Sequence, residues 1–197
     1  MTPEQRSHSP GIRNADLAGS TALVKGYKDW FAAEVYKSFL HCASRIIKAN
    51  NGIVTAFDGD RVMAVFIGGA KRTNAAITAL KIKGAVQEII NSAIKGRYTT
   101  EYQINHAVGV DLSKAFVART GVRGSNDLVW IGSAPNTAAK MSDIRELSYH
   151  TYITSAVYDR LRDDAKFGGP NNTNMWESWW WEEGQATIYR SNWRWTP

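Results

Sequence analysis

A tight turn between two apolar runs restricts the fold of this chain more than any other feature. The runs cover residues 53–57 and 61–66, and the turn between them is Asp58-Gly59-Asp60. Asp-Gly between two apolar runs is a strong signal for a β-hairpin. We therefore predict two antiparallel strands here, with Asp60 at the tip of the hairpin.

Helical and extended patterns on either side of the hairpin complete a known order. Residues 11–19 predict a short strand that ends in a small-residue turn, and apolar steps of three and four follow over about residues 20–50. A second helix is expected over about residues 71–93, and an extended run over residues 104–113 follows it. Strand, helix, hairpin, helix and strand in this order predict an α+β fold of the ferredoxin-like, split βαβ type.

The C-terminal half extends this core. We expect a further extended run, a short helix, a buried strand and a closing hairpin, over residues 114–120, 134–144, 151–155 and 175–191 respectively. No internal repeat and no linker-like change of composition divides the chain. We expect residues 1–10 to be a flexible N-terminal arm and residues 11–197 to be a single domain.

Composition bounds the environment of the protein. Its apolar stretches are too short and too broken to span a bilayer, so we expect no membrane partner. The single cysteine, Cys42, excludes an internal disulfide, and a cytoplasmic location is the resulting expectation. The net charge of +6 suits an anionic ligand such as a nucleotide, but it suits simple solubility equally well. The tryptophans concentrate in the last 22 residues, which predicts a packed C-terminal β element or an interface.

Two aspartates are predicted to meet at one rim of the sheet. In the split βαβ arrangement the first and third strands are neighbours, so the hairpin tip lies beside the end of the first strand. Asp16 lies near the end of that strand, and Asp60 lies at the tip. Close carboxylates raise one another's pKa, and a hard cation such as Mg²⁺ or Mn²⁺ relieves that cost.

The turn after Asp16 adds a site for an anion. Gly19, Ser20 and Thr21 open a helix, whose free amides and positive dipole end suit phosphate. Taken singly, Asp16 is a helix-start residue, Asp60 a turn residue and the Gly-Ser-Thr run an ordinary N-cap. In combination they predict metal-dependent phosphoryl chemistry with two divalent ions.

Three segments resemble motifs of the class III adenylate and guanylate cyclases. Residues 16–21, Asp-Leu-Ala-Gly-Ser-Thr, are similar to the Asp-Ile-x-Gly-Phe-Thr motif of that family. Residues 57–66 are similar to its Gly-Asp-x-x-Met-Ala-x-Phe hairpin. Residues 131–140, Ile-Gly-Ser-Ala-Pro-Asn-Thr-Ala-Ala-Lys, resemble its Ile-Gly-x-x-Val-Asn-x-Ala-Ala-Arg motif. The matches keep the family order, which implies the nucleotidyl cyclase fold over most of the chain.

The resemblance implies a ligand set for metal and phosphate. Asp16 and Asp60 bind two divalent ions, Mn²⁺ or Mg²⁺, and the backbone carbonyl of Leu17 is a further ligand. The amides of residues 19–21 hold the triphosphate. The implied reaction is attack of the ribose 3′-oxygen on the α-phosphorus, which gives a 3′,5′-cyclic nucleotide and pyrophosphate and makes the protein a phosphorus–oxygen lyase.

The third motif implies a shared active site. Asn136 would orient the ribose, and Lys140 stands where the family usually has arginine, so the charge is kept but the fork of donors is lost. In the family one chain supplies the aspartates and its partner the asparagine and the basic residue, which implies a head-to-tail homodimer. Without the resemblance, Asn136 and Lys140 are a helix start and a solvated lysine.

The base-reading positions depart from the family pattern. Purine cyclases read adenine with a lysine and an aspartate at positions that are Ala56 and Val129 here, and the guanine-reading residues are also absent. A site without such a hydrogen-bonding pair loses its discrimination for that base. The late triphosphate lysine of the family has no counterpart near residues 181–184, so another basic residue has to act there or binding is weaker.

A small chain with this motif set, no fused sensor domain and a Trp-rich tail resembles the stand-alone pyrimidine cyclases of Pycsar antiphage systems. That resemblance implies a uridylate or cytidylate cyclase, which makes cyclic UMP or cyclic CMP as a second messenger for a separate effector. UTP is slightly favoured over CTP as the substrate. The tail is equally a hydrophobic closing hairpin.

Three other interpretations stay open at this point. The chain could be a purine cyclase with an atypical base pocket, a catalytically inactive cyclase fold, or a ferredoxin-like domain that binds single-stranded nucleic acid. The intact pair of Asp16 and Asp60 disfavours the inactive fold. The aromatic residues gather at the C-terminus instead of alternating along central strands, so we expect no stable nucleic-acid partner.

Overall fold

The computed structural model describes residues 11–18, 20–112, 116–122, 125–146 and 148–197. Side chains are described from residue 23 onward, apart from residues 116, 122 and 125–128 within the strands. The arm expected over residues 1–10 and Gly19 lie outside the described residues. The first elements are β1 (Gly11–Ala18), α1 (Ser20–Gly26), α2 (Asp29–Ala49), β2 (Gly52–Asp58), β3 (Arg61–Phe66), α3 (Lys71–Gly84), the π-helix η1 (Ala85–Ile90), α4 (Asn91–Arg97) and β4 (Asn105–Leu112).

The C-terminal half begins with a two-stranded ribbon and ends with a hairpin. Its elements are β5 (Phe116–Val122), β6 (Ser125–Ile131), α5 (Ser133–Ser142), β7 (Thr151–Thr154), α6 (Ser155–Tyr158), α7 (Asp163–Lys166), β8 (Phe167–Gly168), β9 (Thr173–Asn174), β10 (Glu177–Trp181) and β11 (Ala186–Ser191).

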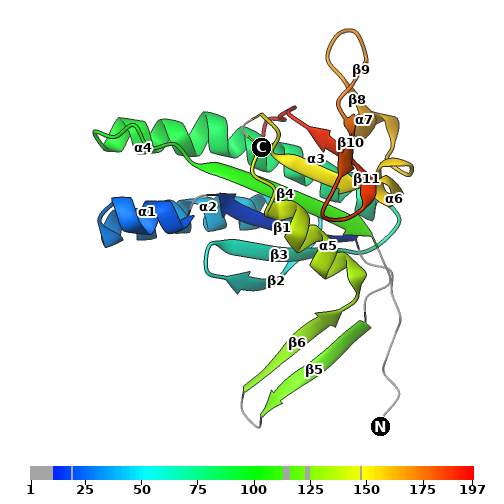
Figure 1. The fold of residues 1–197 in the computed structure, drawn as a ribbon, viewed down its shortest axis with the longest axis horizontal. Coiled ribbons are helices and arrows are strands. Elements are labelled where there is room, and N and C mark those ends of the chain that lie inside the picture. The colour runs from blue at the N-terminus through cyan, green and yellow to red at the C-terminus, as the bar shows by residue number, and fades with distance from the viewer. Residues whose placement is uncertain (1–10, 19, 113–115, 123–124, 147) are drawn as a thin grey trace.

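One seven-stranded sheet organises the molecule, in the order β10-β11-β7-β4-β1-β3-β2 (Figure 1). β1 lies between β3 and β4 and is antiparallel to both, and β2 pairs antiparallel with β3. The run β4-β1-β3-β2 is the predicted ferredoxin-like core, with the first and third strands as neighbours. β7, β11 and β10 extend the sheet beyond β4, in agreement with the expected extra C-terminal strands.

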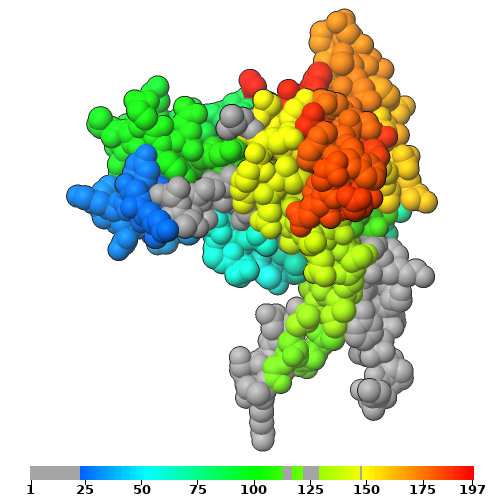
Figure 2. Space-filling view, viewed as in Figure 1, coloured from blue at the N-terminus to red at the C-terminus, as the bar shows by residue number. Residues whose placement is uncertain are grey.

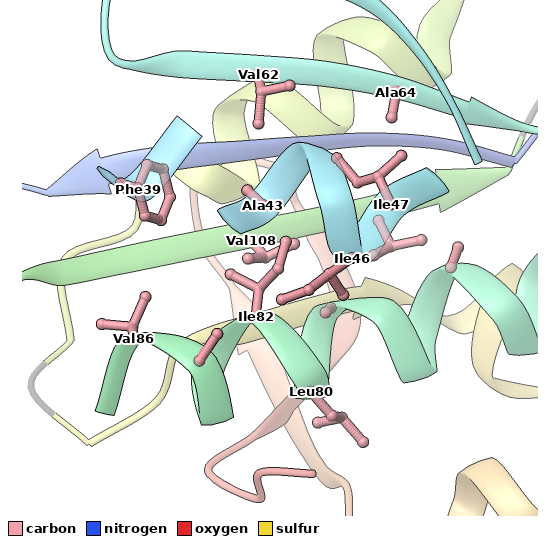
Figure 3. Close-up of a cluster of buried hydrophobic side chains, with 14 of the residues drawn as sticks. Phe39, Ala43, Ile46, Ile47, Val62, Ala64, Leu80, Ile82, Val86 and Val108 are labelled. Atoms are coloured by element: carbon pink, nitrogen blue, oxygen red, sulfur yellow. The ribbon is translucent and has the colours of Figure 1, made fainter. Parts of the chain in front are cut away.

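The main core lies between one face of the sheet and the helices α2 and α3 (Figure 3). Phe39 and Ile47 of α2 and Ile82 of α3 are almost fully buried against the strands. Their spacing gives each helix an apolar stripe toward the sheet, and burial of these side chains stabilises the fold. Within the described ranges, none of the helices has the length and apolar character required to cross a bilayer.

α5 covers the opposite face of the sheet. Gly109 of β4 allows this close approach, because a Cβ atom there would collide with the carbonyl of Ala138 and with Met141 on α5. Met141 is fully buried, together with Ala107 of β4 and Tyr152 of β7, in a second apolar cluster. The C-terminal part of α5 is thereby held against the centre of the sheet.

The helices differ from the sequence prediction at two places. The pattern over residues 20–50 is two helices, α1 and α2, that are interrupted at Tyr27 and Lys28. The helix expected over residues 71–93 runs on to Arg97 and contains the π-helical turn η1. Apolar periodicity continues through both irregularities, because it reports which face is buried and not how each turn is hydrogen-bonded.

The ribbon β5–β6 stands away from the body of the molecule (Figure 1, Figure 2). Its strands pair from Phe116 with Ile131 to Val122 with Ser125. Val129 and Ile131 are exposed on it. A two-stranded ribbon is marginally stable by itself in water. Burial of these exposed apolar side chains in a further contact would stabilise it.

Candidate active site

The backbone brings the positions of the two predicted metal aspartates together. Asp16 lies opposite Arg61 of β3, and Asp60 immediately precedes Arg61 in the hairpin turn. Directly opposite residues of antiparallel strands have Cα atoms about 4.5–5.5 Å apart, so positions 16 and 60 are close neighbours at one rim. The side chain of Asp16 is outside the described part of the structure, and that of Asp60 is half-buried.

The end of β1 leaves the hairpin ladder at this rim. Pairing with β3 ends at Asp16, whereas pairing with β4 continues to Ala18, with Leu17 opposite His106. The backbone beyond Asp16 is therefore not paired with β3. This geometry is compatible with a main-chain ligand at Leu17, the role that the family resemblance implies.

The predicted phosphate turn is partly described. Ser20 is the first residue of α1, so residues 20 and 21 open a helix as expected. Gly19 lies outside the described residues, and the side chains of Ser20 and Thr21 are not described. The binding of triphosphate by residues 19–21 stays a prediction.

The donor set at the rim fits a hard divalent ion. Asp60 supplies carboxylate oxygens, position 16 adds an aspartate on the neighbouring strand, and the end of β1 supplies a carbonyl. Mg²⁺ and Mn²⁺ prefer such oxygen ligands. Among the described side chains, no group of three or more His, Cys, Asp and Glu residues is arranged to hold a metal, but Asp16 does not belong to that set.

A β-bulge in the edge strand β2 sets the predicted base-pocket position. The register shifts between Val54 and Ala56, so that Ala56 pairs with Met63 and the hydroxyl of Thr55 lies 3.3 Å from the carbonyl oxygen of Met63. Since opposite residues share a face, the bulge places Ala56 on the face of Met63 and of Arg61. Val129, the other predicted base-pocket residue, is on the separate ribbon and pairs with Ala118.

Asn136 and Lys140 lie on α5, as the third motif requires. Asn136 is exposed, and the Lys140 ammonium is 3.4 Å from Glu183 Oε1 in the turn between β10 and β11. The side chain of Lys140 is 57% exposed, so this ion pair is weak and easily exchanged. Within one chain, the described contact of Lys140 is therefore with the C-terminal hairpin.

Two side chains near Asp60 were missed in the sequence prediction. Arg61 donates from Nη2 to Asp143 Oδ1 at 2.9 Å, which ties the hairpin to the end of α5. Burial, together with the phenols of Tyr36 and Tyr27 and the carboxylate of Asp60, raises the pKa of Tyr102 to about 12. The signal for Arg61 was the predicted pairing of β1 with β3, which sets it opposite Asp16. Tyr102 lies in a loop with no local signal.

A cavity of about 790 Å³ lies elsewhere, on the face of the sheet that α2 covers. Side chains of α2, η1 and α4 and the ring of Phe57 line it. None of the predicted site residues is part of this lining. The candidate active site at the rim is therefore separate from this apolar cavity.

Comparison with known proteins identifies the family. The chain is 55% identical over 183 residues to a uridylate cyclase of Xanthomonas perforans, an alignment that covers 92% of this chain and 78% of that protein. It is 47% identical over 182 residues to a uridylate cyclase of Burkholderia cepacia, with the same coverage. No family model matches the chain.

A solved structure shows the same fold. The guanylyl cyclase Cya2 superposes with a TM-score of 0.80 over 98% of this chain and 96% of that one, at 14% sequence identity. At this identity the likeness establishes the class III cyclase fold alone, which confirms the predicted α+β architecture. With its close curated relatives and this fold, the chain belongs to the class III nucleotidyl cyclase family and is a nucleotide cyclase.

Proposed function

We propose that this protein is a metal-dependent uridylate cyclase, which converts UTP into 3′,5′-cyclic UMP and pyrophosphate. The observation that carries the proposal is the register of β1 and β3, which sets Asp16 opposite the residue that follows Asp60. The substrate follows from the two relatives, both of which are named uridylate cyclases. CTP is the second candidate substrate.

In the proposed reaction the ribose 3′-oxygen forms a bond to the α-phosphorus, and the bond from that phosphorus to the bridging oxygen of pyrophosphate breaks. Asp16, Asp60 and the carbonyl of Leu17 would hold the divalent ions. When bound, Mg²⁺ or Mn²⁺ lowers the pKa of the attacking hydroxyl and neutralises the leaving group. The amides of residues 19–21 would orient the triphosphate at the start of α1.

The remaining catalytic groups are proposed to come from a second copy of the chain. Asn136 would orient the ribose, and Lys140 would stabilise charge in the transition state, both across a head-to-tail homodimer. The exposed apolar residues Val129 and Ile131 on the ribbon β5–β6 support such an assembly, since their burial in a further contact would stabilise the ribbon.

The two predicted base-pocket positions support a base other than a purine. Ala56 offers a methyl group and Val129 an apolar side chain, and neither can hydrogen-bond to a purine edge. Val129 would reach the base from the partner's ribbon. We propose that base contacts come instead from backbone groups beside the bulge.

The biological role is proposed from the same resemblance. A cyclic pyrimidine nucleotide made in the cytoplasm would act as a second messenger in antiphage defence, read by a separate effector protein. The activity itself can be tested without that context.

The first prediction concerns the product. Incubation of the purified protein with equal concentrations of ATP, GTP, CTP and UTP and with Mn²⁺ should yield mainly cyclic UMP, identified by mass spectrometry.

A second prediction concerns the metal site. Asp60→Asn, which keeps the shape of the side chain but loses the charge, should reduce the rate by at least about 100-fold, since a metal ligand is lost. Cyclic AMP as the main product would contradict the pyrimidine assignment, and full activity of Asp60→Asn would contradict the metal site.

A further inference from the structure

Arg61 is a cation at the centre of an acidic rim. Its Cα partners across the two neighbouring strands are Asp58 of β2 and Asp16 of β1, and Asp60 precedes it in the chain. Its guanidinium contacts Asp143 at the C-terminal end of α5 at 2.9 Å. The backbone positions of three aspartates and the carboxylate of Asp143 thus lie near one arginine.

This rim has to accept a triphosphate in the function proposed above. Four carboxylates by themselves would repel such an anion, and two divalent ions would leave little excess positive charge. The guanidinium of Arg61, beside the ions, supplies this additional positive charge. The planar fork of arginine also fits two phosphate oxygens at once, which the point charge of lysine cannot do.

The ion pair between Arg61 and Asp143 is easily exchanged. The side chain of Asp143 is 51% exposed and that of Arg61 is 28% exposed, and Asp143 has a second cation, Arg145 Nη2, at 3.7 Å. An ion pair with so much solvent contact adds little to stability. The ion pair with Asp143 can therefore be exchanged for a phosphate at small cost, while Arg145 continues to neutralise Asp143.

We propose that Arg61 binds the β- and γ-phosphates of the substrate and exchanges Asp143 for the triphosphate when the nucleotide enters. The inference rests on the proposed function and goes beyond it, because it assigns a substrate contact to a residue outside the matched motif positions. Asp143 serves as the resting partner of the guanidinium and does not touch the substrate.

Binding of a nucleotide that cannot react tests the assignment. We would measure the affinity of 3′-deoxy-UTP, which lacks the attacking hydroxyl, by calorimetry in Mn²⁺ buffer. Arg61→Met should weaken binding by about 10- to 100-fold, the usual loss for hydrogen bonds to a charged group, and Arg61→Lys should recover part of it. The affinity of 3′-deoxyuridine monophosphate, which has no β- or γ-phosphate, should be the same in all variants.

Asp143→Asn is the matched control, because it weakens the same ion pair from the other side. If Arg61 binds phosphate, Asp143→Asn should bind 3′-deoxy-UTP as well as the wild type or more tightly. If the ion pair matters only for structure, Asp143→Asn and Arg61→Met should lose affinity equally, and the proposal is wrong. Should Arg61→Met not fold, the contrast between Arg61→Lys, which should bind more weakly, and Asp143→Asn decides the question.

The outcome separates this inference from the proposed function. Arg61→Met with wild-type affinity, in an enzyme that makes cyclic UMP, would refute only the role of Arg61. A wild-type protein that makes no cyclic nucleotide would refute the proposed function, whatever Arg61 does.

Discussion

Lys83 is a buried charged side chain in the last turn of α3. Its residue is 4% exposed, and its ammonium donates to the backbone carbonyl of Asn192 in the C-terminal tail. Burial, with a smaller contribution from Arg194, lowers the pKa of Lys83 from 10.5 to about 8. The tail is held close to the helix here, since Trp195 also donates to the carbonyl of Leu80 at 3.2 Å.

This shift predicts a stability that rises with pH. Between pH 8 and 10.5 the unfolded chain holds the Lys83 proton more tightly than the folded chain does, so deprotonation favours folding. The free energy of unfolding of the wild type, relative to Lys83→Met, should therefore increase by about 2 kcal/mol from pH 7.5 to 9.5. Urea denaturation at the two pH values measures it, and a difference between the variants that does not change with pH would contradict the shift.

The sequence pattern gives no sign that Lys83 is buried. A lysine in an amphipathic helix is expected in solvent, and only the return of the tail over α3 buries it. By contrast, the positions of Asp16 and Asp60 could be predicted from the sequence, because each residue lies beside a recognisable turn. The pairing of β1 with β3 follows from the order of the elements. Arg61 was not recognised, since its importance comes from the residue across the strand and not from its own motif.

At the scale of elements, the contact between β4 and α5 depends on one missing side chain. Gly109→Ala would drive a methyl group into the backbone of α5 at Ala138. We expect a loss of about 1–3 kcal/mol in the free energy of unfolding, as for other overpacked interiors, and a displaced α5. Gly96→Ala on α4 is the control: a Cβ there meets no atom within 4 Å, and the change should be neutral or stabilising. Equal stability of the two variants would show that α5 does not need this approach.

The elements themselves were largely predictable. The hairpin β2–β3 was marked by its Asp-Gly turn, and the order of strands and helices indicated the ferredoxin-like core. The bulge at Thr55 was not predictable, because an extra residue in an apolar run leaves the apparent alternation almost unchanged. It nevertheless decides which side chain, Thr55 or Ala56, shares a face with the rim.

At the scale of the whole molecule, the described contacts leave the proposed site divided. The carboxylate rim is at the tip of β2–β3, whereas Lys140 on α5 pairs with Glu183 in the β10–β11 turn. Within the described residues of one chain, Lys140 is therefore not in contact with Asp60 at the rim. The family resemblance, and not a contact within one chain, implies that a second copy completes the site.

A head-to-tail dimer predicts that two inactive variants repair one another. Asp60→Asn would disable the carboxylate half of a site and Lys140→Ala the other half, so a heterodimer keeps one intact site of two. Random exchange of subunits makes half of the dimers heterodimers, and the mixture should therefore regain about a quarter of wild-type activity. A mixture of Asp60→Asn with Asp16→Asn should regain no activity, because both substitutions disable the carboxylate half of the site. Folded and dimeric variants that show no recovery in the first mixture would establish that each chain completes its own site.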